Sequence, residues 1–152
     1  MNETFGCSFS PGDNIKAMIR PFLKTAKGEI LLTMYCLEEP DLIADLIAAS
    51  KRGVTVKVIL DHQQECLHAK LGILQNLRNH SITVHVIAGV SGHIMHNKYC
   101  IIDQVTLLTG SFNWTPDALV YNEENYLWIK DQFLIQAYND NFNSLWLRPS
   151  YL

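Results

Sequence analysis

The sequence predicts an α/β fold with a mixed, largely parallel β-sheet flanked by helices on both faces. One observation is that short apolar, β-branched runs recur at 30–36, 54–60 and 82–87, as expected of buried strands. A second is that segments with helical spacing of apolar residues separate these runs. Alternation of strands and helices is typical of a sheet that packs between helical layers.

The first half of the chain supplies most of this alternation. Asp13 or Asn14 can cap the first helix, and Pro21 inside it predicts a kink or an early break. Pro40 opens the second helix and Gly53 ends it. The expected strands are 5–9, 30–36, 54–60 and 82–87, and the expected helices are 15–26, 40–52 and 69–78.

In the second half of the chain, the predicted strands follow one another closely instead of alternating with helices. Strands are expected at 95–103, 106–110 and 125–129, close together in the sequence. Thr115 is a good N-cap and Pro116 a good first residue for a short helix, whose free N–H groups would favour a nearby anion. A wide apolar face predicts a last helix over 132–147.

Length and composition indicate one globular domain over residues 1–152. The apolar fraction is 48% and the net charge is −3, so no basic surplus points to a nucleic-acid partner. Any anion site must therefore come from a local cluster of side chains. No apolar run is long enough to span a bilayer, and we expect no transmembrane segment.

Location and redox state follow from the N-terminus and the cysteines. The first residues lack a basic segment followed by an apolar one, so we expect a cytoplasmic protein, or a periplasmic or secreted one if a leader has been removed. We expect the cysteines to be reduced, although four of them allow two disulfides. The cysteines are Cys7, Cys36, Cys66 and Cys100.

The segment from His96 to Thr115 carries the chemistry. Side chains at i and i+2 of a strand share a face, so His96 and Lys98 should project together, as should Ser111 and Asn113. Gly110 permits close approach of another backbone. An imidazole, an ammonium, a hydroxyl and an amide suit a phosphoryl group, whose transfer needs positioning and charge stabilisation.

Two carboxylates complete the expected site. Glu124 is the candidate partner for the distal nitrogen of His96, with its neighbour Glu123 as the competitor. Asp103 falls at a turn, where we expect a structural or salt-bridging role.

Two histidines and a cysteine in residues 62–68 form a cluster of potential metal ligands, but the sequence does not favour a metal site there. His62, Cys66 and His68 do not match a standard zinc spacing and lack a clear fourth ligand, so a polar loop near the pocket is the preferred interpretation. We therefore expect no metal and no cofactor.

The motif resembles the signature of the phospholipase D superfamily, and the similarity extends over nearly the whole chain. The matching residues are His96-x-Lys98-x₄-Asp103-x₆-Gly110-Ser111-x-Asn113, followed by Asn122-x-Glu124-Asn125. The resemblance implies a phospholipase D-like fold and metal-independent phosphodiester cleavage through a phosphohistidine on His96. Lys98 and Asn113 would hold the phosphoryl oxygens with help from Ser111, and Asp103 would be structural.

The resemblance also implies a homodimer. Larger members carry two motif copies, whereas this chain carries one, so a second chain would supply the general acid. This chain is similar to the short branch of small bacterial endonucleases and a mitochondrial cardiolipin hydrolase. We expect a nuclease on DNA or RNA with little sequence preference. A phospholipid hydrolase and an inactive binding or scaffold protein are the alternatives.

Overall fold

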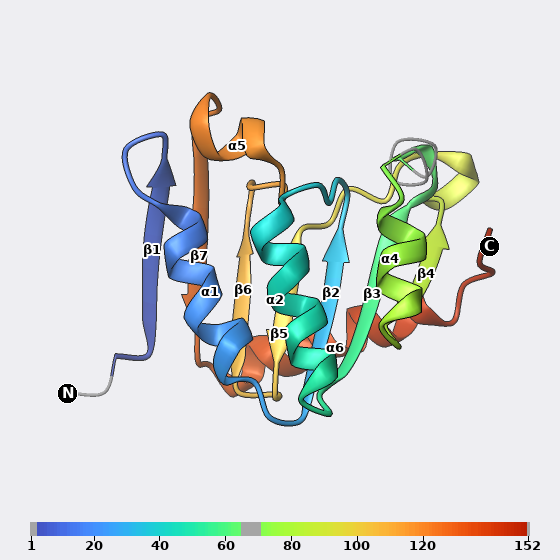
Figure 1. The fold of residues 1–152 in the computed structure, drawn as a ribbon, viewed down its shortest axis with the longest axis horizontal. Coiled ribbons are helices and arrows are strands. Elements are labelled where there is room, and N and C mark those ends of the chain that lie inside the picture. Colours follow the sequence, from blue (N-terminus) through green and yellow to red (C-terminus); the bar gives the residue numbers. More distant parts are fainter. Residues whose placement is uncertain (1–2, 65–70, 152) are drawn as a thin grey trace.

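The computed structural model describes residues 3–64 and 71–151, and in this part of the chain seven strands form one sheet. The strand order is β1-β7-β6-β5-β2-β3-β4 (Figure 1). The strands are β1 (Phe5–Ser10), β2 (Glu29–Met34), β3 (Thr55–Asp61), β4 (Thr83–Ile87), β5 (Tyr99–Ile102), β6 (Thr106–Gly110) and β7 (Glu124–Ile129). The helices are α1 (Ile15–Thr25), α2 (Pro40–Lys51), α4 (Ile73–Asn79), α5 (Pro116–Val120) and α6 (Gln132–Trp146), with short 3₁₀ turns η1 (His62–Gln64) and η2 (Val90–Gly92).

The predicted mixed sheet between helical layers is confirmed, but the sheet is less parallel than predicted. Parallel pairing is confined to β2–β3 and β3–β4, and the other four described strand pairs are antiparallel. The reason lies in the connections. Helical crossovers follow β2 and β3, whereas a tight turn joins β5 to β6 and permits only antiparallel pairing.

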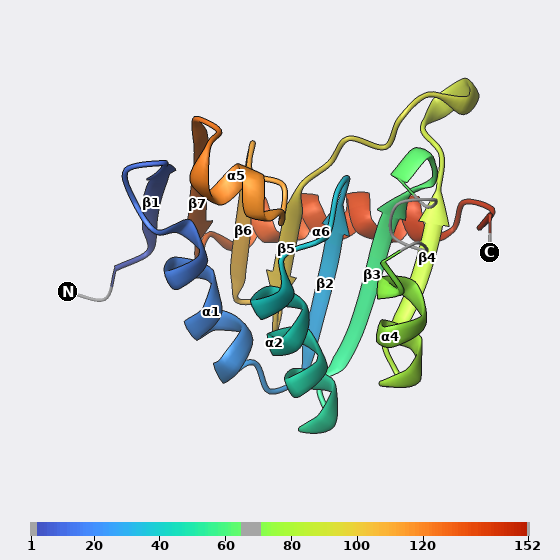
Figure 2. The ribbon, with the colours of Figure 1, turned by 45° about the horizontal axis from the view of Figure 1, so that its top comes forward.

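Helices cover both faces of the sheet. Figures 1 and 2 show α1, α2 and α4 in front, while α6 crosses behind the strands. Strand β3 illustrates the resulting two cores. Val58 and Leu60 join the cluster under the front helices, and Ile59 joins the cluster under α6. Alternate residues of a strand face opposite sides, so a strand covered on both faces is apolar throughout.

Helix boundaries differ in detail from the predictions. Asn14 is the N-cap of α1 and accepts from Ala17 N at 3.0 Å. The helix continues past Pro21 to Thr25, so no early break occurs. Ala17, whose carbonyl would bond to the missing N–H of Pro21, is exposed and can be hydrated. The third predicted helix is shorter than expected because α4 begins only at Ile73; residues 69 and 70 lie outside the described residues.

Two further predictions concern membranes and cysteines. None of the described helices combines the length and hydropathy that crossing a bilayer requires. Cys7, Cys36 and Cys100 carry free thiols. Cys66 lies outside the described residues.

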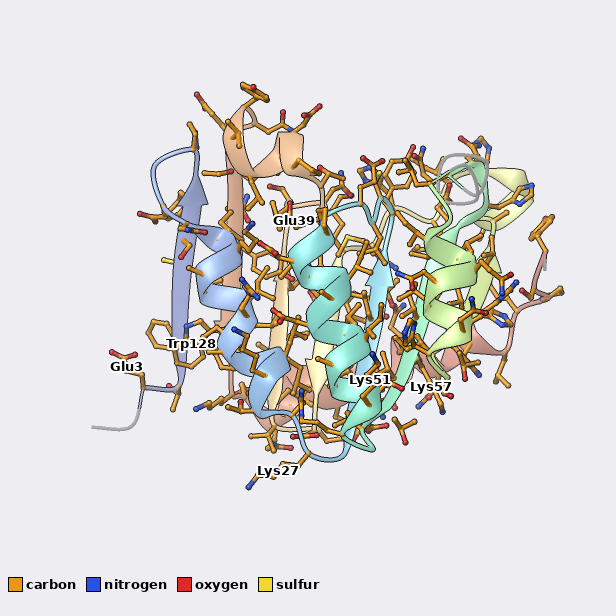
Figure 3. All side chains as sticks on the ribbon, in the orientation of Figure 1. Glu3, Lys27, Glu39, Lys51, Lys57 and Trp128 are labelled. Carbon is orange, nitrogen blue, oxygen red and sulfur yellow. The ribbon has the colours of Figure 1, made fainter. Side chains whose placement is uncertain are left out.

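Asp103 ties the β5–β6 turn to the start of β2. Its carboxylate accepts from Lys27 N at 2.9 Å, Gly28 N at 2.7 Å and Glu29 N at 2.9 Å. Burial acts to raise the pKa of this carboxyl, but the three N–H groups outweigh it and lower the pKa. Figure 3 shows Lys27 at the opposite end of the sheet from Glu39, the N-cap of α2. Asp103 therefore has the structural role expected of it.

We predict that Asp103→Ala lowers the free energy of unfolding by roughly 2 kcal/mol at pH 7, because three N–H groups lose a charged acceptor. The folded-state pKa is depressed, so this contribution is present above the unfolded-state pKa, about 3.9, and is lost as pH falls through the folded-state value. Urea unfolding at pH 7 and at lower pH measures it. Asp140→Ala is the control, since the Asp140 carboxylate accepts from the side chain of the exposed Gln136 and, within residues 3–64 and 71–151, holds no backbone N–H. An equal effect of both variants would contradict the assignment.

Candidate active site

The predicted site residues meet at one end of the sheet, the end where β2 and β3 terminate. The parallel strands β2 and β3 end there, the antiparallel strands β5 and β7 begin there, and β6 ends there. Figures 1 and 2 show α5 at the same end. Strand ends from both halves of the chain thus bring distant residues together, and we call this region the site end.

His96 and Lys98 lie in an extended segment before β5, not on the strand that was predicted to begin at Met95. The two side chains nevertheless meet. Lys98 Nζ is 3.2 Å from both ring nitrogens of His96 and donates to the His96 carbonyl at 3.0 Å. Lys98 is buried, with 7% of its surface exposed, whereas His96 is exposed. The imidazole is therefore accessible to a substrate and the ammonium lies beneath it.

The pKa of His96 is shifted in the direction that suits a nucleophile. Burial lowers the pKa of His96, the charge of Lys98 lowers it further, and Asp61 opposes both. Burial also lowers the pKa of Lys98, against the charges of Glu124 and Cys36. A histidine with a lowered pKa is neutral at physiological pH, and only the neutral ring has a lone pair for attack.

Glu124 does not bond to His96 within the chain, contrary to the prediction. Its carboxylate accepts from the Ser111 hydroxyl, in a short hydrogen bond, and from Asn122 Nδ2 at 3.1 Å. Ser111 Oγ in turn accepts from Asn125 N at 3.1 Å. Since the one hydroxyl hydrogen of Ser111 points to Glu124, Ser111 orients this carboxylate and is not free to donate to a phosphoryl oxygen as well.

Gly110 makes this arrangement possible. A Cβ atom at this position would overlap the carbonyl oxygen of Asn125 on the neighbouring strand β7. The close approach lets Ser111 N donate to Asn125 O at 3.1 Å. Only glycine lets the two backbones come this near, which explains the glycine before the serine.

Asn113 has an unusual environment. Its Oδ1 is buried and has no hydrogen-bond partner among the described residues. The adjacent Trp114 is buried in the core, and its carbonyl accepts from Glu38 N at 2.7 Å and Glu39 N at 2.8 Å. The loop carrying Asn113 is therefore held against the start of α2. A buried polar atom without a partner is rare and is often found at functional sites.

The sequence prediction missed two residues of the site end. The Tyr35 ring, just after β2, lies 4.6 Å from the His96 ring. Asp61, the fully buried last residue of β3, accepts from Met95 N at 2.5 Å and from Gln63 N at 2.9 Å. One available signal was that ligand sites of α/β sheets lie at the carboxyl ends of parallel strands.

The histidine and cysteine cluster is only partly described. His62 stacks on Tyr151 with ring centroids 4.1 Å apart. Cys66 and His68 lie outside the described residues, so the sequence interpretation of this loop stays untested. In the described part of the chain, no group of three or more potential metal ligands is found.

Comparisons with known proteins show the family and the fold to which the chain is similar. Residues 19–146 match the family model described as "Cardiolipin synthase, PLD-like domain". The solved structure of Nuc from Salmonella typhimurium, a phospholipase D family member, aligns with a TM-score of 0.89 at 28% identity over 97% of each chain. The phospholipase D of Rickettsia bellii (strain RML369-C) is 37% identical over 136 residues, which are 90% of this chain and 66% of that protein.

A mitochondrial relative is more distant and longer. The mitochondrial cardiolipin hydrolase of Canis lupus familiaris is 29% identical over 141 residues, which are 92% of this chain and 54% of that protein. The chain thus spans between about half and two thirds of the length of these curated relatives.

We predict that Asp61→Asn loosens the segment that carries His96. An amide has one acceptor oxygen, so it can satisfy only one of the N–H groups of Met95 and Gln63. Loss of a hydrogen bond to a charged group should speed hydrogen exchange at the Met95 amide by about tenfold or more. Asp131→Asn is the control, because Asp131 also accepts a backbone N–H but caps α6. Unchanged exchange at Met95 would show that the carboxylate does not hold this segment.

Proposed function

Because this chain belongs to the phospholipase D-like family, we propose that it hydrolyses phosphodiester bonds with His96 as the nucleophile. The observation that carries the proposal is the pairing of an exposed imidazole with a buried ammonium 3.2 Å away at the site end. The imidazole supplies a neutral attacking nitrogen, and the ammonium supplies a fixed positive charge for the phosphoryl oxygens.

The reaction proceeds in two displacements. A ring nitrogen of His96 forms a bond to phosphorus while the bond to the leaving oxygen breaks, and a second histidine gives that oxygen a proton. Water then attacks the phosphohistidine, the nitrogen–phosphorus bond breaks, and the second histidine takes the proton from the water. Lys98 and the Asn113 amide hold the non-bridging oxygens in both steps. No metal ion takes part in this scheme.

A second copy of the chain supplies the second histidine. The sequence contains one His-x-Lys pair that is followed by Gly-Ser-x-Asn, at His96 and Lys98, and a two-fold axis would place the two His96 rings on opposite sides of one phosphorus atom. The exposure of His96 supports this arrangement, because the ring stays accessible from the side that a partner would occupy.

Nucleic acid is the substrate we favour. The support is the resemblance of the motif to that of small bacterial endonucleases, and the fold of Nuc is similar over 97% of both chains. The net charge of −3 favours a local phosphate contact through Lys98 over a broad basic surface. A phospholipid hydrolase is the second candidate, supported by the names of the curated relatives. An inactive scaffold is disfavoured because His96, Lys98 and Asn113 are all retained.

We expect the purified protein to cleave plasmid DNA and single-stranded oligonucleotides in the presence of EDTA, and His96→Ala to lose activity by at least about 10³-fold without unfolding. Product analysis against cardiolipin vesicles runs in parallel. Cleavage of vesicles alone would transfer the proposal to lipids. A fully active His96→Ala variant would rule out the nucleophile.

We expect sedimentation to give a mass near twice 17.3 kDa. Co-refolding wild type with His96→Ala should reduce activity as the square of the wild-type fraction, because a mixed dimer lacks one of the two imidazoles. A linear decrease would mean that each chain carries a complete site. Mixing with Asp140→Ala, which leaves the site intact, is the control.

A further inference from the structure

We propose that Tyr35 is a positioning residue, whose ring holds the His96 imidazole and the Lys98 ammonium in their reactive arrangement. The inference rests on the proposed function, because it assigns a residue to that same site. Neither the sequence motif nor the family comparison assigns a role to this tyrosine.

The Tyr35 ring touches both reactive groups at once. Its centroid is 4.6 Å from that of His96, with the ring planes inclined by 59°. Lys98 Nζ lies over the same ring, 5.3 Å from its centroid. An aromatic face attracts a cation at this distance, and an inclined aromatic pair is a favourable geometry. One side chain therefore packs against both groups and restrains them together.

Strand pairing and a side-chain hydrogen bond together fix the position of the Tyr35 ring. Strand β2 pairs with β5 through Thr33 and Tyr99, so the residues just beyond this pair, including Tyr35, lie beside the segment that carries Lys98. The Tyr35 hydroxyl accepts from Gln64 Nε2 at 3.0 Å, and Gln64 belongs to η1, which follows β3. The ring is half-buried between the ends of β2 and β3.

His96 needs such a support because the expected carboxylate is engaged elsewhere. Glu124 accepts from Ser111 and Asn122. In the described residues, the hydrogen-bond contacts of the imidazole are with Lys98 alone. The inclined packing of the Tyr35 ring therefore helps to define the plane of the imidazole. A displacement of about 1 Å at a reacting group can cost about 100-fold in rate.

The charged surroundings predict how the imidazole titrates. Burial and the Lys98 charge lower the pKa of His96, and Asp61 raises it. Removing the Tyr35 ring relieves burial, so the pKa of His96 should rise and the acid limb of kcat/KM should move to higher pH. The ionisable groups around the pair are Lys98 on the same segment, Tyr35 and Cys36 after β2, Asp61 on β3 and Glu124 on β7.

The test compares Tyr35→Leu with Tyr35→Phe. Leucine removes the ring face, so kcat should fall by about 10- to 100-fold while KM changes by less than about threefold. Phenylalanine keeps the face and should retain activity within about threefold. A stacking platform for substrate would instead raise KM. Phe22→Leu is the matched control, because Phe22 is also half-buried and packs at an inclined angle against Trp128, near the end of β7 that is remote from the site end.

Titration of the His96 ring by NMR gives a readout that does not depend on substrate. The His96 titration should move to higher pH in Tyr35→Leu and stay unchanged in Tyr35→Phe and Phe22→Leu. An unmoved titration together with unchanged kcat in Tyr35→Leu would overturn the role of Tyr35. If the titration moves but no phosphodiester is cleaved by the wild type, the positioning stands and the proposed function fails.

Discussion

The site depends on one buried cation. Lys98 is 7% exposed, and an ammonium taken out of water is costly unless polar or aromatic groups replace its hydration. The replacements come from separate parts of the chain: the His96 carbonyl and ring, the face of Tyr35 and the negative charge of Glu124. The position of the ammonium therefore determines where the imidazole, the tyrosine and the carboxylate must lie. The strand order β7-β6-β5-β2-β3 brings these side chains to the same end of the sheet.

The two ends of the sheet have different tasks. At one end, Asp103 joins the β5–β6 turn to the start of β2 with three backbone hydrogen bonds. At the other end, Asp61 holds the segment before β5 through Met95 N. Asp103 thus stabilises the β5–β6 hairpin, and Asp61 positions the segment that carries His96 and Lys98. Asp61 ends β3 and Asp103 directly follows β5, and both strands are covered by helices, so the reactive groups rest on a rigid framework.

Much of the fold could be predicted from sequence, because buried strands and amphipathic helices leave a local pattern. Asn14, Thr115 and the Asp103 turn are local signals of this kind and are confirmed by their hydrogen bonds. The extent of antiparallel pairing was underestimated because it depends on β5 lying beside β2, which no local pattern encodes. The contacts of Tyr35 and Asp61 with the His96 segment arise from the same long-range pairing. The bond between Ser111 and Glu124 depends on how closely β7 approaches Gly110.

The pairing of β1 with β7 has a consequence for biosynthesis. The partners are residues 5–10 and 124–129, so the first strand of this sheet to be synthesised cannot pair until the last strand of the sheet has been made. Until β7 has formed, β1 has no strand with which to pair, and β6 has an open edge on the side that β7 will occupy. The nascent chain is thus most prone to aggregation late in translation, when nearly all of its sheet exists but its outer strands do not. Chaperones that shield unpaired strands would act on this chain in that interval.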